Sequence, residues 1–245
     1  LRYPQLTPLL AYHLLYVPLV LQRARHVVCN SEATAREVHG RLRVPLRRMS
    51  VLRLGFNPGR LRPLGLQRGH ELLVLGRHDP HKNLMRLIKV FAGLRDREHQ
   101  LHFVGPHDRR YTPRLQRLAA ELGVENRCRW TAWVSDEERL QLLNRARALL
   151  IPSLWEGFGL PALEAMACGT PVLAATSGAL PEVVGDAAIL LDPCAPAQMA
   201  SCIDDFLADV PLQKQMQQAG PLRASQFSWS QAAAELTDRL RQLQP

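Results

Sequence analysis

From Glu71 onward, short apolar runs alternate with stretches whose apolar residues recur at helical spacing. Strands are predicted over Glu71–Leu75, Gln100–Val104, Arg127–Thr131, Ala148–Ser153, Pro171–Ala175 and Ala188–Leu191. Helices are predicted between them over Asn83–Arg95, Tyr111–Leu122, Asp136–Arg145, Pro161–Cys168 and Pro181–Val184. Strands that alternate with helices are typical of βαβ units. The pattern therefore predicts an α/β fold with a doubly wound, mainly parallel sheet.

The two ends of the chain depart from this alternation. The pattern indicates a helix over Tyr3–Leu21, a strand over Arg25–Cys29, a helix over Ser31–Gly40 and a final helix over Ser228–Leu243. Proline interrupts the segment Asn57–Pro63, which is typical of a linker. We therefore expect residues 1–56 to end a preceding domain, 57–70 to link, 71–227 to form the main domain, and 228–245 to pack on a neighbour.

Charge favours anionic partners without choosing among them. The chain has 245 residues, enough for a sizeable core, with 31 Lys and Arg against 22 Asp and Glu and a formal net charge of +9. Nucleotides, nucleic acid and acidic membrane surfaces all attract such a protein. The basic residues are spread along the chain, aromatics make up only 6%, and no nucleic-acid motif is recognised. We expect no nucleic acid partner, whereas a nucleotide diphosphate and a membrane surface stay open.

Cysteine and histidine usage bears on compartment and metal. The five cysteines are scattered, without a CxxC pair, and the nine histidines show no HExxH spacing. We therefore expect a reduced, cytoplasmic compartment and no bound metal. The apolar stretch Leu9–Leu21 is interrupted by His13 and Pro18 and is too short to cross a bilayer. Because Leu1–Pro4 is neither a Met start nor a signal peptide, we expect a piece of a longer protein.

The segment Glu156–Glu164 is the most informative in the chain: a glycine loop between a predicted strand and a predicted helix, with a carboxylate at each end. A loop that opens a helix presents unpaired backbone N–H groups and the positive end of the helix dipole to an anion such as phosphate. Glu164 could equally serve the helix start, where a carboxylate contributes about 0.3–1 kcal/mol. Glu156 is not needed for capping and follows a strand end, where ligands of open α/β sheets bind.

Three further loops carry candidate chemistry. Arg77 and Lys82 follow the first strand and could neutralise a diphosphate, although a solvated basic turn would look the same. Gly55 allows close backbone approach in a loop before the main domain, with an ordinary turn as the alternative. Ser177–Glu182 runs into another predicted helix at the same edge of the sheet as Glu156, and a plain connection explains it as well.

Taken in order, these segments resemble family 4 of the retaining glycosyltransferases, which have two facing Rossmann-like domains (the GT-B fold). The resemblance rests on Asn30–Glu32, Gly55–Asn57, Arg77 with Lys82, the E-x7-E segment Glu156–Glu164, and Gly178–Ala188. It runs from about Tyr3 to the end of the chain. Asn57 stands where the family often has Asp, and Ala132 where Gly is common.

The resemblance implies a role for each candidate residue. Arg77, Lys82 and Glu156 would be the catalytic set, the two cations holding a diphosphate and Glu156 the hydroxyls of the donor sugar. The donor would also contact Gly55, the backbone N–H groups of Phe158, Gly159 and Leu160, and Glu164, which would bind the ribose. In the family the leaving phosphate is thought to act as base, so that configuration is retained without a protein nucleophile or a metal.

The resemblance also implies that the N-terminal, acceptor-binding domain is largely missing. We expect this chain alone to bind a nucleotide sugar without transferring it to a saccharide or lipid-linked acceptor. The Pro80–Asn83 turn and Val134–Glu138 resemble mannosyltransferases of surface polysaccharide assembly, so GDP-mannose is the first donor expected, with UDP- or ADP-hexoses as alternatives. Peripheral contact with the inner membrane face would suit such an enzyme. The alternative function is a non-catalytic nucleotide-binding or interaction module on the same scaffold.

Overall fold

The computed structural model describes residues 15–243, which group into two compact units. The larger unit comprises Leu54–Trp229. The smaller one combines the residues up to Arg53 with those from Ser230 on. Each unit is described by itself.

The larger unit is built on a six-stranded, all-parallel sheet with the strand order β5-β4-β3-β6-β7-β8. Its strands are β3 (Glu71–Leu75), β4 (Gln100–Val104), β5 (Cys128–Thr131), β6 (Ala148–Ile151), β7 (Val172–Ala175) and β8 (Ile189–Leu191). The chain moves outward from β3 to β5, then returns to β6 on the other side of β3. The order reverses between β3 and β6, and this switch point is where doubly wound sheets bind ligands.

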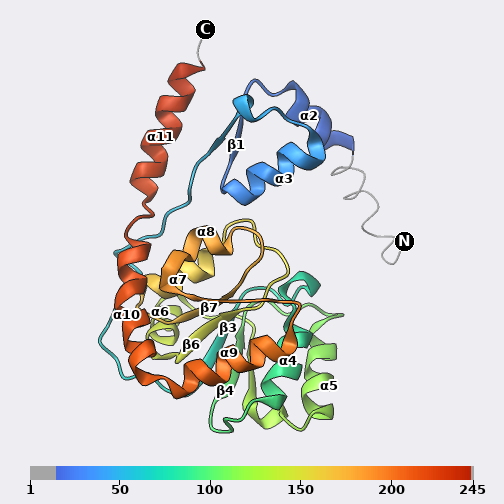
Figure 1. Ribbon diagram of the computed structural model, residues 1–245, viewed down its shortest axis with the longest axis vertical. Coiled ribbons are helices and arrows are strands. Elements are labelled where there is room, and N and C mark those ends of the chain that lie inside the picture. Colours follow the sequence, from blue (N-terminus) through green and yellow to red (C-terminus); the bar gives the residue numbers. More distant parts are fainter. Residues whose placement is uncertain (1–14, 244–245) are drawn as a thin grey trace. The chain divides into compact units, whose positions relative to one another are not determined.

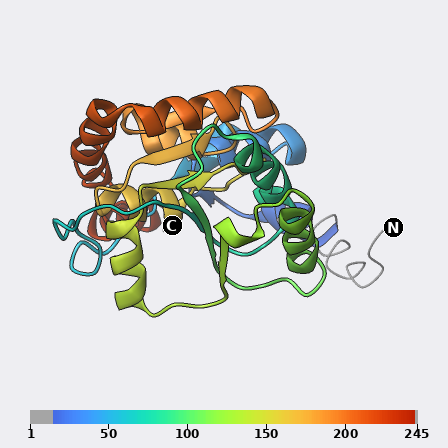
Figure 2. The same cartoon turned by 90° about the horizontal axis from the view of Figure 1, so that it is seen from below.

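Helices cover both faces of this sheet (Figures 1 and 2). Helix α4 packs with α5 and α9, whereas α7 packs with α6, α8 and α10. Their bounds are α4 (Leu84–Gly93), α5 (Thr112–Glu121), α6 (Asp136–Arg145), α7 (Leu160–Ala167), α8 (Leu180–Val184), α9 (Pro196–Ala208) and α10 (Val210–Ala224). Short 3-10 turns are η4 (Pro80–Lys82), η5 (Glu125–Arg127) and η6 (Gly185–Ala187). The predicted Rossmann-like, doubly wound α/β fold is confirmed.

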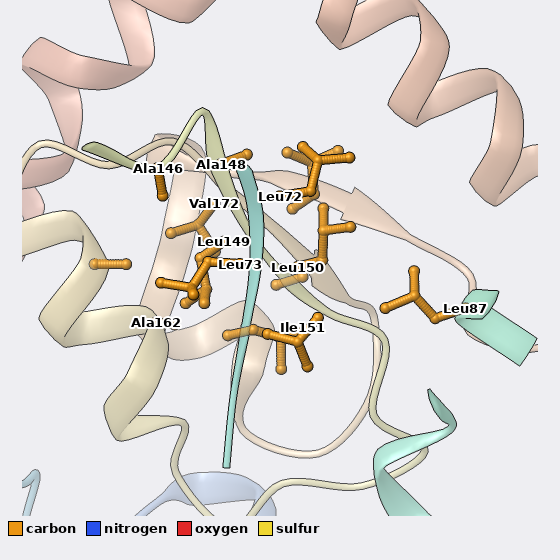
Figure 3. Packing of buried hydrophobic residues seen from close by; sticks show 14 of the residues in the cluster. Leu72, Leu73, Leu87, Ala146, Ala148, Leu149, Leu150, Ile151, Ala162 and Val172 are labelled. Atoms are coloured by element: carbon orange, nitrogen blue, oxygen red, sulfur yellow. The ribbon is translucent and has the colours of Figure 1, made fainter. Parts of the chain in front are cut away.

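The core of the larger unit lies at the central strands, whose apolar side chains point to both faces of the sheet. All four residues of β6 are buried, and Leu72 and Leu73 of β3 are fully inaccessible to solvent. Figure 3 shows these side chains packing with Leu87 of α4 and Ala162 of α7. A strand covered on both faces reads as a continuous apolar run, which is why β6 was visible in the sequence.

The predicted strands and helices between Glu71 and Leu191 are all present, with ends that differ by at most a few residues. Outside that range, α9, α10 and β2 (Met49–Val51) were not predicted. Most of the helix predicted over Tyr3–Leu21 lies outside the described residues, which show α2 (Val17–Arg23).

Within the larger unit, the segment before β3 packs on helices α6 and α7, although it contains no helix or strand of its own. The partly buried guanidinium of Arg68 donates to the carbonyls of Leu143 and Ala146 at the end of α6 and of Cys168 and Gly169 at the end of α7. Burial lowers the pKa of Arg68 to about 10. The contacts of this segment therefore group residues 54–70 with the sheet domain.

The smaller unit contains a two-stranded parallel sheet of β1 (Val27–Cys29) and β2. Helix α3 (Glu32–Leu42) is capped by Ser31, whose hydroxyl accepts from the Thr34 N–H. The 3-10 turn η3 (Leu46–Arg48) precedes β2, and α11 (Trp229–Gln242) ends the described chain. None of the helices within residues 15–243 is both long and apolar enough to cross a membrane.

Candidate functional site

The loops that follow β3 and β6 meet at the switch point of the sheet. Lys82 ends η4 after β3, and Glu156 lies in the loop between β6 and α7. The Lys82 Nζ atom lies 2.6 Å from Glu156 Oε1, and both side chains are largely buried, with 18% and 12% of their surface exposed. The structure thus brings together two of the three residues that the sequence suggested as catalytic.

Neighbouring groups hold this ion pair in place. Asn83, with a left-handed backbone, directs its side-chain amide to the carbonyls of Pro152 and Pro193 at 3.1 and 2.8 Å. The Leu154 N–H donates to the His81 carbonyl, so the two loops are also joined through their backbones. These bonds fix the start of α4 against the loop after β6.

Glu156 has one occupied and one available carboxylate oxygen. Its Oε1 accepts from Lys82 and from the Ser153 hydroxyl, the latter at 2.6 Å. Its Oε2 has no hydrogen-bond donor among residues 15–243, and it is not among their buried, unpaired polar atoms. This oxygen can therefore accept a hydrogen bond from an incoming hydroxyl group.

The N-terminus of α7 presents free backbone donors beside Glu156. In the part of the chain that the structure describes, the N–H groups of Phe158, Gly159 and Leu160 have no acceptor. Gly159 is the N-cap of the helix and has a φ of 101°. The Phe158 side chain is buried and packs edge-on against Phe227, so its backbone, not its ring, is available to a ligand. These donors could bind an anion at the positive end of the helix.

Glu164 lies in a neighbouring pocket of about 260 Å³, whose lining includes Gly55, Leu160 and Arg139. The Arg139 guanidinium donates to Glu164 Oε2 and forms an ion pair with it. Burial raises the pKa of Glu164 above its usual value, Arg139 opposes this rise, and Asp136 adds to it. The pocket therefore contains a largely buried carboxylate that is bonded to one arginine.

Gly55 lies on the wall of the same pocket, against the chain that leads into α11. A Cβ atom on Gly55 would come 2.2 Å from the backbone nitrogen of Trp229. The neighbouring Phe56 pairs with Ser228 in an isolated parallel bridge. Gly55 is required here by close approach of two backbones, and it brings Phe56 and Asn57 to the pocket lining.

Gly178 lies in the loop after β7, which packs against the Glu156 loop. The Ala179 N–H donates to the Glu156 carbonyl at 2.9 Å, and the Ser177 hydroxyl donates to the Ser153 carbonyl. A Cβ atom on Gly178 would lie 2.3 Å from the Glu156 carbonyl oxygen. The loop that the sequence marked as a second helix entry thus positions Glu156.

Arg77 differs from the other candidates in its position. Its side chain is 70% exposed, and its charged neighbour is Asp79, with 3.5 Å between Arg77 Nε and Asp79 Oδ2. It follows the same strand as Lys82 but does not join the pair that Lys82 forms with Glu156. Its assignment to the catalytic set stays a prediction.

Two site residues were not found from the sequence. Ser153 bonds Glu156 from three positions earlier, and Arg139 bonds Glu164 from helix α6. Ser153 lies in the loop after β6, and Arg139 lies in the first turn of the helix that follows β5. A search of all polar residues in the loops and first helical turns at the carboxyl edge of the sheet could have found both. Their bonding partners are set by the rotation of loop and helix, which the pattern of apolar residues does not show.

Residues 65–223 match the family described as Glycosyl transferases group 1. The chain belongs to this family. It is 33% identical over 217 residues to the MMP alpha-(1->4)-mannosyltransferase of Mycolicibacterium hassiacum, covering 84% of this chain and 51% of that protein. It is 31% identical over 241 residues to the D-inositol 3-phosphate glycosyltransferase of Streptomyces avermitilis, covering 89% and 52%. The chain thus spans about half the length of these curated relatives.

Solved structures of glycosyltransferases share the fold. The sucrose-phosphate synthase of Thermosynechococcus elongatus superposes with a TM-score of 0.84 at 25% identity, covering 94% of this chain and 61% of that one. Anabaena HepE, in complex with UDP and glucose, gives a TM-score of 0.84 at 23% identity, with 93% and 66% covered. The expected GT-B relationship is confirmed.

Proposed function

We propose that this chain is the donor-binding portion of a retaining glycosyltransferase that moves a hexose from a nucleotide diphosphate sugar. The observation that carries the proposal is the buried Lys82–Glu156 pair at the switch point, beside the free N–H groups of α7. A cation, an available carboxylate oxygen and a helix N-terminus together suit a phosphate with a sugar attached. Family membership and the glycosyltransferase relatives support the same conclusion.

Each part of the ligand has residues suited to it. Lys82 and the backbone donors of Phe158, Gly159 and Leu160 would bind the diphosphate, and exposed Arg77 would approach it from the solvent side. Glu156 would accept hydroxyl groups of the sugar through Oε2. Glu164 would accept those of the ribose in the neighbouring pocket. Charge that develops on the departing phosphate is stabilised by cations and helix N–H groups already in place.

Retention of configuration follows from the family resemblance, with the leaving phosphate as the base. The reaction would need no metal, because Lys82, Arg77 and the α7 terminus supply the positive charge. Removal of divalent cations with EDTA should accordingly leave nucleotide affinity unchanged. A cytoplasmic enzyme acting at the inner membrane face would meet lipid-linked acceptors there.

The donor is proposed at two levels of detail. A nucleotide diphosphate hexose is supported by relatives such as the M. hassiacum mannosyltransferase and by HepE, which was solved with UDP-glucose. GDP-mannose remains our first choice because of the mannosyltransferase relatives. The acceptor would be a saccharide or a lipid-linked saccharide.

Binding of GDP, UDP and ADP by calorimetry tests the proposal. We expect Glu164→Ala to weaken the best nucleotide by about 5- to 150-fold, which corresponds to about 1–3 kcal/mol for lost charge-assisted hydrogen bonds. Lys82→Ala should weaken nucleoside diphosphates more than the nucleoside, since it removes a phosphate contact. The control is Glu121→Ala, which removes an exposed carboxylate at the end of α5.

The pattern among the three variants decides the proposal. Equal affinity in Glu164→Ala and Glu121→Ala would contradict the ribose role of Glu164. Failure of the wild-type chain to bind any of the three nucleotides, or their sugar conjugates, would contradict the donor-binding proposal as a whole.

A further inference from the structure

Arg139 occupies a position that the proposed function does not yet explain. It lies in α6, and its backbone N–H donates to the Ser135 carbonyl at 2.8 Å. From there its guanidinium reaches across to Glu164 of α7 and bonds Oε2. The Glu164 side chain is only 15% exposed, while that of Arg139 is 35% exposed. Glu164 Oε1 has no donor among residues 15–243 and is not among their buried, unpaired polar atoms.

Other charges around Glu164 are already engaged or neutral. Asp136, on the same helix as Arg139, pairs with Arg60 of the preceding segment at 2.7 Å. The thiol of Cys168, one turn farther along α7, has its pKa raised to about 11 by burial and is neutral. Arg68 donates to carbonyls at the end of α7. Within the described chain, Arg139 is thus the cation bonded to Glu164.

We propose that Arg139 is a positioning residue that keeps Glu164 ionised and directs its second oxygen into the pocket. This inference rests on the proposed role of Glu164 in ribose binding. With Oε2 held by the guanidinium, Oε1 remains free to accept from the hydroxyl groups of a nucleotide. Arg139 thereby acts on the ligand through Glu164.

The physical reason lies in the cost of burying a carboxylate. Burial favours the protonated acid, which offers a donor where two ribose hydroxyls need acceptors. A guanidinium bonded to the carboxylate favours the ionised form. Burial and Asp136 raise the pKa of Glu164, and Arg139 lowers it. Without Arg139, Glu164 would become protonated at a higher pH and would lose acceptor capacity closer to neutrality.

The first experiment measures Glu164 itself and needs no ligand. Side-chain carboxyl carbons of ¹³C-labelled glutamate are titrated by NMR in the full chain, with Glu164→Gln to assign the signal. Arg139→Met, which keeps a long apolar side chain without the charge, should raise the pKa of Glu164. Arg139→Lys should restore most of the wild-type behaviour. Arg60→Met is the matched control, because it removes a cation from the same pocket lining without breaking a bond to Glu164.

The second experiment follows GDP and UDP affinity against pH in the same variants. In Arg139→Met the fall in affinity on acidification should begin at higher pH than in the wild type, and Arg139→Lys should reverse this shift. A structural role alone would lower affinity equally at every pH.

An unmoved Glu164 pKa in Arg139→Met, or equal shifts in Arg139→Met and Arg60→Met, would overturn the inference. If neither nucleotide binds the wild type, the proposed function fails, while the carboxyl titration still decides the role of Arg139. Should Arg139→Met not fold, the lysine variant and Arg139→Gln are titrated in its place.

Discussion

At the scale of single residues, His78 shows how burial sets a charge. It follows β3, is 1% exposed, and packs against Phe103, Trp130 and the ring of His107. Its Nδ1 lies 2.8 Å from the Thr112 hydroxyl, whereas its Nε2 is buried without a partner in the described chain. Burial first, and the neighbouring His107 second, lower the pKa of His78 to about 4. His78 is therefore neutral in the folded protein at physiological pH.

This shift predicts a specific loss of stability in acid. The unfolded chain binds a proton at His78 near pH 6.5 and the folded protein only near pH 4, so stability falls as pH drops through this window. The contribution lost is on the order of 3 kcal/mol. His78→Leu should flatten the pH dependence of the free energy of unfolding between these values, as measured by urea denaturation. The exposed His81→Gln is the control, and matching slopes for wild type and His78→Leu would contradict the assignment.

The sequence predicts where a site residue lies along the fold, but not which side chain it bonds. Lys82 and Glu156 were found because each follows a strand, and neighbouring parallel strands bring their carboxyl ends together. The bond between them, and that of Arg139 to Glu164, could not be found, because each needs the rotation of a loop or helix. The roles assigned to the site residues stay predictions until binding is measured.

At the scale of helices and strands, local signals were informative where they agreed with packing. Ser135 and Glu138 have the sequence spacing of a capping box, and they form one at the start of α6. Helix α10 was missed because Gly220 and Pro221 lie inside it and normally signal a break. Packing against α7 outweighs that preference: a Cβ on Gly220 would already lie 3.1 Å from the Met166 carbonyl oxygen. Close helix contact selects glycine there, which local propensity does not reveal.

The loop after β7 leads to a prediction about Gly178. Its φ of 60° is left-handed, and an added Cβ would also collide with the Glu156 backbone. Gly178→Ala should therefore combine backbone strain of roughly 1–2 kcal/mol with overpacking of about 1–3 kcal/mol. It should also displace Glu156 and weaken binding of a nucleotide sugar more than binding of the free nucleotide. Thermal or urea unfolding and calorimetry measure the two effects.

Gly123 provides the matched control for this substitution. Its φ is 67°, close to that of Gly178, yet a Cβ there would meet nothing within 4 Å. Gly123→Ala should show the backbone strain alone and leave ligand binding unchanged. If the two variants lose equal stability and bind the nucleotide sugar equally well, the contact between Gly178 and Glu156 does not position Glu156 for binding.

At the scale of the whole molecule, the chain carries one complete sheet domain and matches about half the length of its curated relatives. The sequence predicted the sheet of this domain because its strands are short apolar runs and the helices between them have apolar residues at helical spacing. We expect the 245-residue chain to bind the nucleotide sugar but not to transfer it. The physical reason is that an acceptor must be held beside the donor for reaction, and orientation supplies much of the catalytic effect.

Incubation of the chain with GDP-mannose or UDP-glucose and a saccharide acceptor, followed by product analysis, checks this expectation. The control is calorimetric binding of the same nucleotide sugar under the same conditions. Robust transfer by the 245 residues alone would refute the expectation, whereas binding without transfer would support it.

The bonds of Arg68 determine where the sheet domain can be shortened. A polypeptide begun at Glu71 would retain every strand and helix of the larger unit, yet the carbonyls that end α6 and α7 would lose their shared donor. Those two helices carry Arg139 and Glu164, so trimming a segment without secondary structure would loosen the pocket around Glu164 and would also remove the lining that Gly55, Phe56 and Asn57 supply. Protein engineers who graft or exchange this domain should therefore place the junction upstream of Gly55, outside the segment that Arg68 anchors.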